Sequence, residues 1–364
     1  MKVTAAVLRS GDSPYELLEV ELQAPQPGEV RVRIVGAGMC HTDTGMRAPF
    51  RNIDFPVVLG HEGAGVIEAV GAGVDLRIGQ PVVLSFRSCR NCPNCLNGEL
   101  AYCDTMFTLN FEVHRGDGTT AFSLDGAPIG SHFFGQSSFA THVIADARSV
   151  VPVADDAQLD IIGPLGCGVQ TGAGAVLNTL RPRPNSPIAI IGSGAVGLSA
   201  LLAAVMIGCG PIVAIDRHPG RLELARNLGA THTLDAGDDL ATSLLNITDG
   251  RGFDNIFDTT GVGEVFSAAA LALAIRGTLA TVAAHGEAPM AEFSMRSLIN
   301  GRSVKGIIEG DAVPQTFIPE LLARHKSGDF PFDRLVTHFP FDQINEAEQA
   351  SADGSVIKPV LTMP

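Results

Sequence analysis

Six of the seven cysteines fall into two groups whose spacing suits metal ligation. The first group forms a Cys-x2-Cys-x2-Cys-x7-Cys run, whose first three members stand among Arg, Asn and Pro: Cys89, Cys92, Cys95 and Cys103. Four thiolates from a single loop complete a tetrahedron around zinc and leave no position for a substrate, as in structural zinc sites. The run therefore predicts a structural zinc loop over residues 89–103. The seventh cysteine, Cys209, ends an apolar stretch and fits a small buried side chain.

The second group is dispersed along the chain and combines two cysteines with one histidine: Cys40, His61 and Cys167. Two thiolates and one imidazole fill three zinc positions and leave the fourth for water or substrate, which is the arrangement of a catalytic site. A lone histidine is more often a hydrogen-bonded core residue than a ligand, so this prediction depends on the whole set. Thiolate-rich ligation favours zinc over other divalent ions.

The composition indicates a folded chain with room for two domains. Of its 364 residues, 45% are hydrophobic and 18% are charged, which argues against disorder. A formal net charge of -14 disfavours nucleic acid and anionic membranes as partners. The apolar run before Arg9 is too short for a signal peptide, so we expect a cytoplasmic location, where cysteines bind metals more readily than they form disulfides.

The pattern of elements changes twice along the chain. Residues 1 to about 165 hold short β-type runs separated by Gly and Pro, which predict a barrel or sandwich. After Cys167, strands alternate with helical stretches, beginning at residues 187–191, and this alternation predicts a parallel sheet with crossover helices. From about Ser303 the short strands return. We therefore expect domains at 1–168, 169–304 and 305–364, with the last segment returning to the first domain.

A nucleotide-binding motif opens the parallel-sheet segment. Gly192, Gly194 and Gly197 form a Gly-x-Gly-x-x-Gly turn directly after a strand and before an apolar helix, and Asp216 ends the next strand. Such a turn lets the helix N-terminus approach a pyrophosphate, while the carboxylate accepts hydrogen bonds from the adenosine ribose. A carboxylate there repels a 2′-phosphate and favours NAD over NADP, although Arg217 next to it tempers this. A tight turn followed by an acidic strand end is the plainer alternative.

Together these motifs resemble the zinc-dependent alcohol dehydrogenases of the medium-chain dehydrogenase/reductase superfamily, over essentially the whole chain. The resemblance is carried by Gly60-His61-Glu62-Gly63-Ala64-Gly65, the four-cysteine loop, Gly166-Cys167-Gly168 with Thr171-Gly172, and the nucleotide motif. Residues 304–311 and 330–333 look most like the aryl-alcohol (benzyl alcohol) dehydrogenase branch. The resemblance implies an α/β fold, in which a Rossmann doubly wound parallel sheet is inserted into a GroES-like β-barrel catalytic domain.

The resemblance also implies roles for individual residues. Cys40, His61 and Cys167 would hold a catalytic zinc that acts as a Lewis acid on the alcohol oxygen, while NAD takes up the hydride. Thr42 would receive the alcohol proton, Asp43 would orient His61, and Glu62 would assist ligand exchange at zinc. The further implied cofactor contacts are His41, Thr171, Arg221 and Lys358. Plainer readings are a helix cap for Thr42, a cap or surface acid for Asp43, an ion-pair partner for Glu62, and solvated charges for Arg221 and Lys358.

One position departs from the family pattern. Familiar members end the proton relay on a histidine a few residues after Thr42, where this chain has Gly45. The resemblance implies a neutral, hydrophobic primary alcohol, aryl or allylic, with Phe133 and Phe134 as candidate pocket residues, and a homodimer or homotetramer with two zinc ions per chain. Alternatives are a formaldehyde or polyol dehydrogenase of the same superfamily, or a non-catalytic protein that binds zinc and nucleotide.

Overall fold

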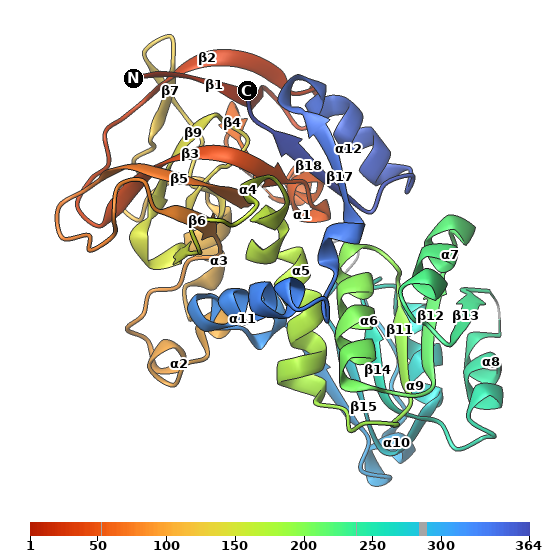
Figure 1. Ribbon diagram of the computed structural model, residues 1–364. Coiled ribbons are helices and arrows are strands. Elements are labelled where there is room, and N and C mark those ends of the chain that lie inside the picture. The colour runs from red at the N-terminus through yellow and green to blue at the C-terminus, as the bar shows by residue number, and fades with distance from the viewer. Residues whose placement is uncertain (52, 238, 284–289) are drawn as a thin grey trace. The chain divides into compact units, whose positions relative to one another are not determined.

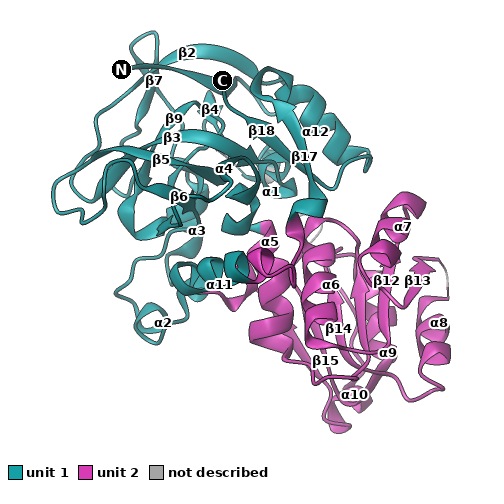
Figure 2. Cartoon of the chain, in the orientation of Figure 1, with its two compact units in different colours: residues 1–167, 313–323, 333–364 teal, residues 168–312, 324–332 magenta. Residues whose placement is uncertain are grey.

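The computed structural model describes residues 1–51, 53–237, 239–283 and 290–364. The chain divides into two compact units (Figure 2). Unit 1 comprises Met1–Cys167, Val313–Ala323 and Asp333–Pro364, and unit 2 comprises Gly168–Ala312 and Arg324–Phe332. The first boundary follows Cys167, close to the expected residue 168. The chain returns to unit 1 at Val313 rather than at 305, and it passes through unit 2 once more before its final segment.

Unit 1 consists mainly of two β-sheets (Figure 1). The five-stranded sheet has the order β4-β1-β2-β7-β8, and the seven-stranded sheet has the order β10-β6-β5-β3-β18-β17, with β9 also paired to β3. The strands are β1 Lys2–Leu8, β2 Glu16–Leu22, β3 Glu29–Gly38, β4 Val57–Val58, β5 Glu62–Val70, β6 Pro81–Leu84, β7 Phe122–Leu124, β8 Ala127–Ile129, β9 His142–Asp146, β10 Val150–Pro152, β17 Val336–Pro340 and β18 Lys358–Thr362. The helices of this part are α1 His41–Gly45, α2 Pro93–Leu96, α3 Met106–Phe111, α4 Leu159–Ile162 and α12 Ile344–Ala352, and α11 Pro314–Lys326 continues from unit 1 into unit 2.

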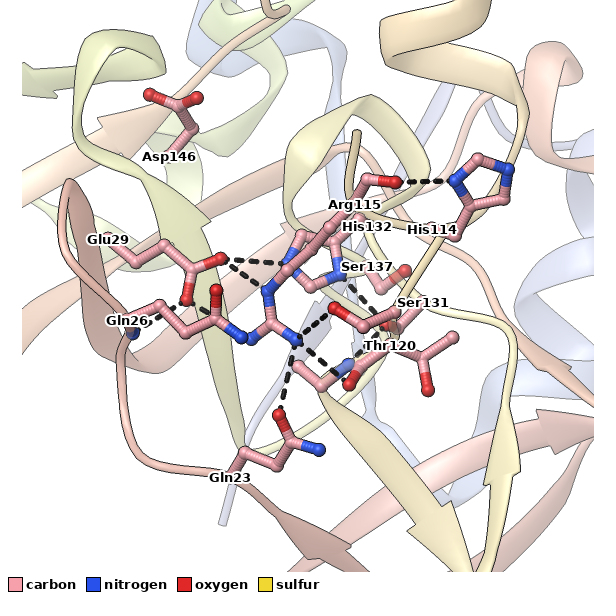
Figure 3. Close-up of polar contacts among 12 residues, drawn as sticks. Gln23, Gln26, Glu29, His114, Arg115, Thr120, Ser131, His132, Ser137 and Asp146 are labelled. Carbon is pink, nitrogen blue, oxygen red and sulfur yellow. Dashed lines mark hydrogen bonds and ion pairs between the residues drawn. The ribbon is translucent and has the colours of Figure 1, made fainter. Parts of the chain in front are cut away.

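A buried polar network fixes the start of β3, the strand that leads toward Cys40 (Figure 3). The Arg115 guanidinium donates to both carboxylate oxygens of Glu29, at 2.6 and 3.1 Å, and also to the Thr120 carbonyl oxygen. Burial alone would raise the pKa of Glu29, but hydrogen bonds from His132 and Arg115 outweigh it and lower the pKa to about 2. The Glu29 carboxylate therefore stays charged and anchors β3 at neutral pH.

Unit 2 is built around one six-stranded parallel sheet of order β13-β12-β11-β14-β15-β16. The order reverses between β11 and β14, which is the switch point where open α/β sheets bind ligands. The strands are β11 Ile188–Ile191, β12 Ile212–Asp216, β13 His232–Asp235, β14 Phe253–Asp258, β15 Leu273–Thr281 and β16 Ser303–Gly306. The helices are α5 Gly168–Gly174, followed by a π-helical stretch at Ala175–Leu180, then α6 Ala195–Ile207, α7 Pro219–Asn227, α8 Leu240–Ile247, α9 Gly263–Leu271 and α10 Met295–Ile299.

The central strands of unit 2 are buried because their sequences are apolar on both faces. Residues 188–191 and 212–216 are buried throughout. One hydrophobic core contains Ala189, Ile191, Val213 and Ile215 of these strands together with Leu244 of α8, Phe253 of β14 and Ala269 of α9. Continuous apolar strands of this kind are typical of parallel sheets. Within the described residues, no helix has the length and hydropathy needed to cross a bilayer.

Candidate metal centres and nucleotide site

The three dispersed ligand candidates meet in unit 1. Single ligand atoms of Cys40, His61 and Cys167, together with Glu62, all lie within 4.8 Å of one another. Cys40 caps α1, His61 immediately precedes β5, and Cys167 follows a 3-10 turn at Gly163–Gly166. His61 and Cys167 are buried, and Cys40 is half-buried. The structure thus brings together residues that are far apart in the sequence.

Strand register explains why these segments meet. β3 and β5 are antiparallel, and Gly38 at the end of β3 pairs with Glu62 at the start of β5. Cys40 and His61 lie just beyond these paired ends. The Ser85 hydroxyl donates to the Gly166 carbonyl oxygen at 2.7 Å and ties the turn before Cys167 to the end of β6.

Asp43 holds the His61 ring in one orientation. Asp43 Oδ1 lies 3.0 Å from His61 Nδ1 and also accepts from the Gly60 amide at 3.0 Å, while Oδ2 accepts from the Cys40 amide at 3.0 Å. A carboxylate can only accept here, so Nδ1 carries the proton and Nε2 presents its lone pair. Nε2 is buried and has no hydrogen-bond partner among the described residues. An unpartnered imidazole nitrogen beside two thiols fits a metal ligand.

The electrostatics of the cluster favour a thiolate. The pKa of Cys40 is lowered well below its usual value by its hydrogen bond with Cys167, and the positive charge of Lys358 adds to this against the cost of burial. Zinc binds the thiolate form of cysteine. The Cys40, His61 and Cys167 side chains therefore fit zinc by donor type, by proximity and by charge.

Lys358 lies beside this cluster rather than at a phosphate site. Its side chain is 3% exposed, and Nζ donates to Glu62 Oε1 at 3.0 Å, to Glu62 Oε2 at 2.9 Å and to the Met39 carbonyl oxygen at 3.0 Å. Burial would lower the pKa of Lys358, but the charges of Glu62 and Cys40 raise it. With its three ammonium donors used in this way, Lys358 does not fit the expected pyrophosphate contact. β18 places it here because that strand pairs with β3.

Three further residues of interest belong to the short helix α1, which Cys40 caps: His41, Thr42 and Gly45. Thr42 Oγ1 lies 3.6 Å from Cys40 Sγ, so its hydroxyl is next to a candidate zinc ligand. His41 is exposed at the first position of α1. Among the described residues, no atom lies within 4 Å of a Cβ atom built on Gly45, so the position that lacks the family histidine has room for a side chain.

The four-cysteine loop forms the second cluster. Its four sulfur atoms all lie within 4.8 Å of one another, and they belong to Cys89, Cys92, Cys95 and Cys103. Backbone N–H groups point at the sulfurs: the Cys89 amide donates to Cys103 Sγ at 3.2 Å, and the Cys92 amide donates to Cys89 Sγ at 3.3 Å. Hydrogen bonding by the Asn91 backbone lowers the pKa of Cys89 to about 6, whereas burial and the neighbouring Cys92 raise the pKa of Cys95 to about 12. Four such thiols ionise together only around a cation, which fits a closed zinc site.

The glycine-rich turn of unit 2 has the geometry of a nucleotide site. Gly192 has a φ of +92°, and a Cβ atom on Gly197 would collide with the Gly192 carbonyl oxygen, so both positions require glycine. Gly194 caps α6, and the nearest atom to a Cβ built there is Arg221 Nη1 at 4.0 Å. The turn follows β11, at the carboxyl edge of the sheet next to the switch point.

Asp216 ends β12 beside this turn. Its Oδ2 accepts from the Ser193 amide at 2.7 Å, and its Oδ1 accepts from the His218 amide at 2.9 Å and lies 2.8 Å from His218 Nδ1. Arg221 Nη1 lies 4.0 Å from Oδ2. Burial would raise the pKa of Asp216, but the Ser193 and His218 hydrogen bonds lower it. Thr171 is buried in α5 of the same unit.

Phe133 and Phe134, the candidate pocket residues, lie against His61: the centroid of the His61 ring is 4.6 Å from that of Phe134 and 5.3 Å from that of Phe133. Two further features of these sites were not predicted from the sequence. Phe111 of α3 contacts both phenylalanines, at 5.1 and 6.0 Å, although no motif marks it. The second is the contact of His218 with Asp216, for which the only sequence signal is a histidine two residues after the strand's terminal acid.

Family models match both parts of the chain. The model described as "Alcohol dehydrogenase GroES-like domain" matches residues 26–155, and the model described as "Zinc-binding dehydrogenase" matches residues 195–326. The first range lies within unit 1, and the second begins at α6 of unit 2. These matches confirm the expected fold class, a GroES-like domain combined with a Rossmann-type domain.

Full-length relatives support the same assignment. The chain is 45% identical over 362 residues to geraniol dehydrogenase of Castellaniella defragrans, covering 98% of this chain and 96% of that protein. It is 35% identical to S-(hydroxymethyl)glutathione dehydrogenase of Komagataella pastoris, covering 100% and 98%.

Two solved structures share the complete fold. One is an alcohol dehydrogenase zinc-binding domain protein from Burkholderia ambifaria, with a TM-score of 0.97, 45% identity and coverage of 100% of this chain and 99% of that one. The other is benzyl alcohol dehydrogenase from Acinetobacter calcoaceticus, with a TM-score of 0.96, 40% identity and coverage of 100% of both chains. On these grounds, the chain belongs to the zinc-dependent, NAD-linked alcohol dehydrogenases of the medium-chain dehydrogenase/reductase superfamily.

Proposed function

We propose that this alcohol dehydrogenase interconverts primary aryl or allylic alcohols and their aldehydes, transferring a hydride between the alcohol carbon and NAD. The observation that carries the proposal is the aromatic cluster of Phe111, Phe133 and Phe134 against the His61 ring. Aromatic rings favour flat, apolar partners over charged or strongly hydrated ones. Relatives named for geraniol and for benzyl alcohol, an allylic and an aryl alcohol, support the same class.

In this proposal the catalytic zinc is held by Cys40, His61 and Cys167. When bound, it supplies a Lewis acid that favours deprotonation of the alcohol. The Thr42 hydroxyl, beside Cys40, accepts the alcohol proton and starts its relay to solvent. Asp43 keeps the proton on His61 Nδ1 and so fixes the orientation of Nε2. Lys358 holds both carboxylate oxygens of Glu62, so Glu62 approaches the metal only when that ion pair yields.

The proposal extends to the cofactor and to the second metal. Gly192, Gly194 and Gly197 receive the pyrophosphate of NAD at the N-terminus of α6, and Asp216 binds the adenosine ribose. Arg221 contributes at the adenosine end, as its position beside Gly194 and Asp216 allows. His41 and Thr171 are proposed as further cofactor contacts. The four-cysteine loop holds the structural zinc.

The substrate class is tested with a panel of alcohols under NAD reduction at 340 nm. We expect kcat/KM for benzyl alcohol, cinnamyl alcohol and geraniol to exceed that for ethanol by about a hundredfold, because burying the larger apolar group stabilises the transition state by about 3 kcal/mol. Phe111→Ala should reduce this preference. Phe107→Ala is the matched control, because Phe107 is 65% exposed at the outer edge of the cluster.

Three further substrates in the panel test the alternatives, because a higher kcat/KM for any of them than for the primary aryl and allylic alcohols would contradict the proposal. A higher kcat/KM for cyclohexanol would refute the primary-alcohol assignment. A higher value for S-(hydroxymethyl)glutathione would favour the formaldehyde dehydrogenase alternative, and a higher value for sorbitol would favour the polyol alternative.

We further propose that two copies of the chain associate along β16. This strand ends the sheet order of unit 2, and it is flanked by exposed apolar side chains on β15 and α10. Ile275 of β15 is 72% exposed and Ile299 of α10 is 86% exposed, and Leu298 of α10 and Val304 of β16 are exposed as well. An exposed apolar edge strand is a ready surface for pairing with a second copy. A homodimer, or a tetramer built from such dimers, would cover it.

Light scattering after gel filtration tests this association. We expect the unmodified protein to have at least twice the chain mass of 38.0 kDa, and Ile299→Lys to shift it toward the monomer. Ile78→Lys is the control, because Ile78 is also exposed but lies on a loop of unit 1. A monomeric wild type, or an unchanged mass for Ile299→Lys, would remove this surface as the interface.

A cytoplasmic location is part of the same proposal. Each of the seven cysteines is a free thiol, including the six in the two clusters. Thiolates that ligate zinc persist most readily in a reducing compartment. Fractionation of the native cells, with the activity recovered together with a cytoplasmic marker, checks this location.

A further inference from the structure

The acceptor positions of Asp216 are nearly all used by the protein itself. A carboxylate offers about four lone-pair positions. In Asp216, Oδ1 is engaged by the His218 amide at 2.9 Å and by His218 Nδ1 at 2.8 Å, and Oδ2 is engaged by the Ser193 amide at 2.7 Å. Arg221 approaches the same Oδ2 at 4.0 Å. A single well-placed acceptor position therefore remains for a ligand.

A ribose presents two neighbouring hydroxyl groups, and each can donate to a carboxylate. Binding both requires one more acceptor position than Asp216 has free. The two amide contacts come from the backbone, at the glycine-rich turn and at the start of α7 (Figure 1), so they persist when a ligand binds. The imidazole contact is the one that can be released by rotating a side chain.

Among the described residues, the His218 ring has no hydrogen-bond partner other than Asp216. His218 is the N-cap residue of α7, but its side chain makes no cap hydrogen bond. The side chain is 34% exposed, whereas that of Asp216 is 7% exposed. The ring therefore lies at the solvent edge over a buried carboxylate, and it can turn outward without disturbing the helix.

We propose that His218 is a specificity-determining residue of the nucleotide site, whose ring competes with the adenosine ribose for Asp216 Oδ1. This inference rests on the proposed role of Asp216 as the ribose acceptor. The competition weakens binding of an unphosphorylated ribose, because the Asp216–His218 hydrogen bond must break before both hydroxyls dock. A 2′-phosphorylated ribose gains little when the ring leaves, because only its 3′-hydroxyl can donate to Asp216 and the acceptor position that is already free accommodates that one donor. The His218 ring thus reduces the difference in affinity between the cofactor with an unphosphorylated ribose and the cofactor with a 2′-phosphorylated ribose.

Calorimetric titration of the zinc-loaded enzyme with ADP-ribose and with 2′-phospho-ADP-ribose tests the proposal. Both ligands lack the nicotinamide, so the readout is binding and not turnover. We expect His218→Ala to bind ADP-ribose about tenfold more tightly, the effect of releasing one hydrogen bond to a charged group. Binding of 2′-phospho-ADP-ribose should stay equal or weaken, so the ratio of the two affinities rises by about the same tenfold.

Two further variants make the result decisive. Arg226→Ala removes an exposed cation from the last turn of the same helix, α7, and should leave ADP-ribose affinity unchanged. Asp216→Ala should weaken ADP-ribose binding; if it does not, the proposed ribose role of Asp216 fails. If Asp216→Ala weakens binding while His218→Ala leaves it unchanged or weaker, the inference about His218 alone is overturned. A thermal midpoint of His218→Ala equal to wild type shows that the variant is folded.

Discussion

Cys40→Ser should contain one zinc ion per chain instead of two and should lose kcat/KM by about a thousandfold or more. The expected loss is large because Cys40 supplies one of two thiolates in the cluster with His61 and Cys167. A serine hydroxyl stays protonated at neutral pH and binds zinc far less well than a thiolate. Metal analysis of the purified variant, followed by steady-state assays with NAD and benzyl alcohol, measures both effects.

The same variant should leave the rest of the protein intact. Cys40 lies at a helix cap in unit 1, whereas the glycine-rich turn and Asp216 lie in unit 2. ADP-ribose affinity is therefore expected to stay unchanged. Cys209→Ser is the matched control, because Cys209 is a buried free thiol outside both clusters and should keep two zinc ions and full activity. A Cys40→Ser enzyme with two zinc ions and normal rates would show that the catalytic metal lies elsewhere.

The sequence indicated which residues would gather in these clusters better than it indicated the side chains that surround them. Metal ligation constrains residue type strongly, so four closely spaced cysteines and the Cys40, His61, Cys167 set were visible without a structure. The glycine-rich turn was equally visible, because only glycine fits the φ of +92° at Gly192 and the close approach at Gly197. The fold class followed from strand periodicity, and the family models confirm it.

Contacts that depend on tertiary register could not be predicted in this way. Lys358 was expected at a phosphate, but the pairing of β18 with β3 buries it against Glu62. A lysine near the end of a chain has the same appearance in the sequence whether it is solvated or buried. Phe111 and His218 were missed for the same reason, since neither belongs to a motif and each acts through a neighbour set by the fold.

The placement of Glu62 bears on how many protein ligands the proposed catalytic zinc has. Its carboxylate lies within reach of the metal cluster, so it could act as a fourth protein ligand. Both of its oxygens, however, accept hydrogen bonds from the Lys358 ammonium, and burial raises the pKa of Glu62. A carboxylate engaged in this way is a weaker competitor for zinc than a free one. The arrangement therefore favours three protein ligands, as catalysis at an open zinc site requires.

Cys95→Ser should remove the zinc of the four-cysteine loop and make that loop more mobile, while the enzyme keeps its activity. We expect one zinc ion per chain and kcat/KM within about tenfold of wild type, because the loop's cysteines are distinct from the Cys40, His61 and Cys167 set. Trypsin cleavage after Arg90 should become faster by an order of magnitude or more. Timed digestion followed by mass spectrometry of the fragments measures the change.

The physical reason is that the part of the loop around Arg90 has little else to order it. Apart from Cys92, the residues between Cys89 and Cys95 are Arg, Asn and Pro, and Leu96 just beyond them is 73% exposed. Arg90 is held by hydrogen bonds to the Arg148 carbonyl oxygen and to Gln315, which alone are too few to protect the backbone once the metal is lost. Cys40→Ser, in contrast, should digest at the wild-type rate. If Cys95→Ser resisted trypsin as well as wild type while lacking one zinc, hydrogen bonding and not the metal would be holding the loop.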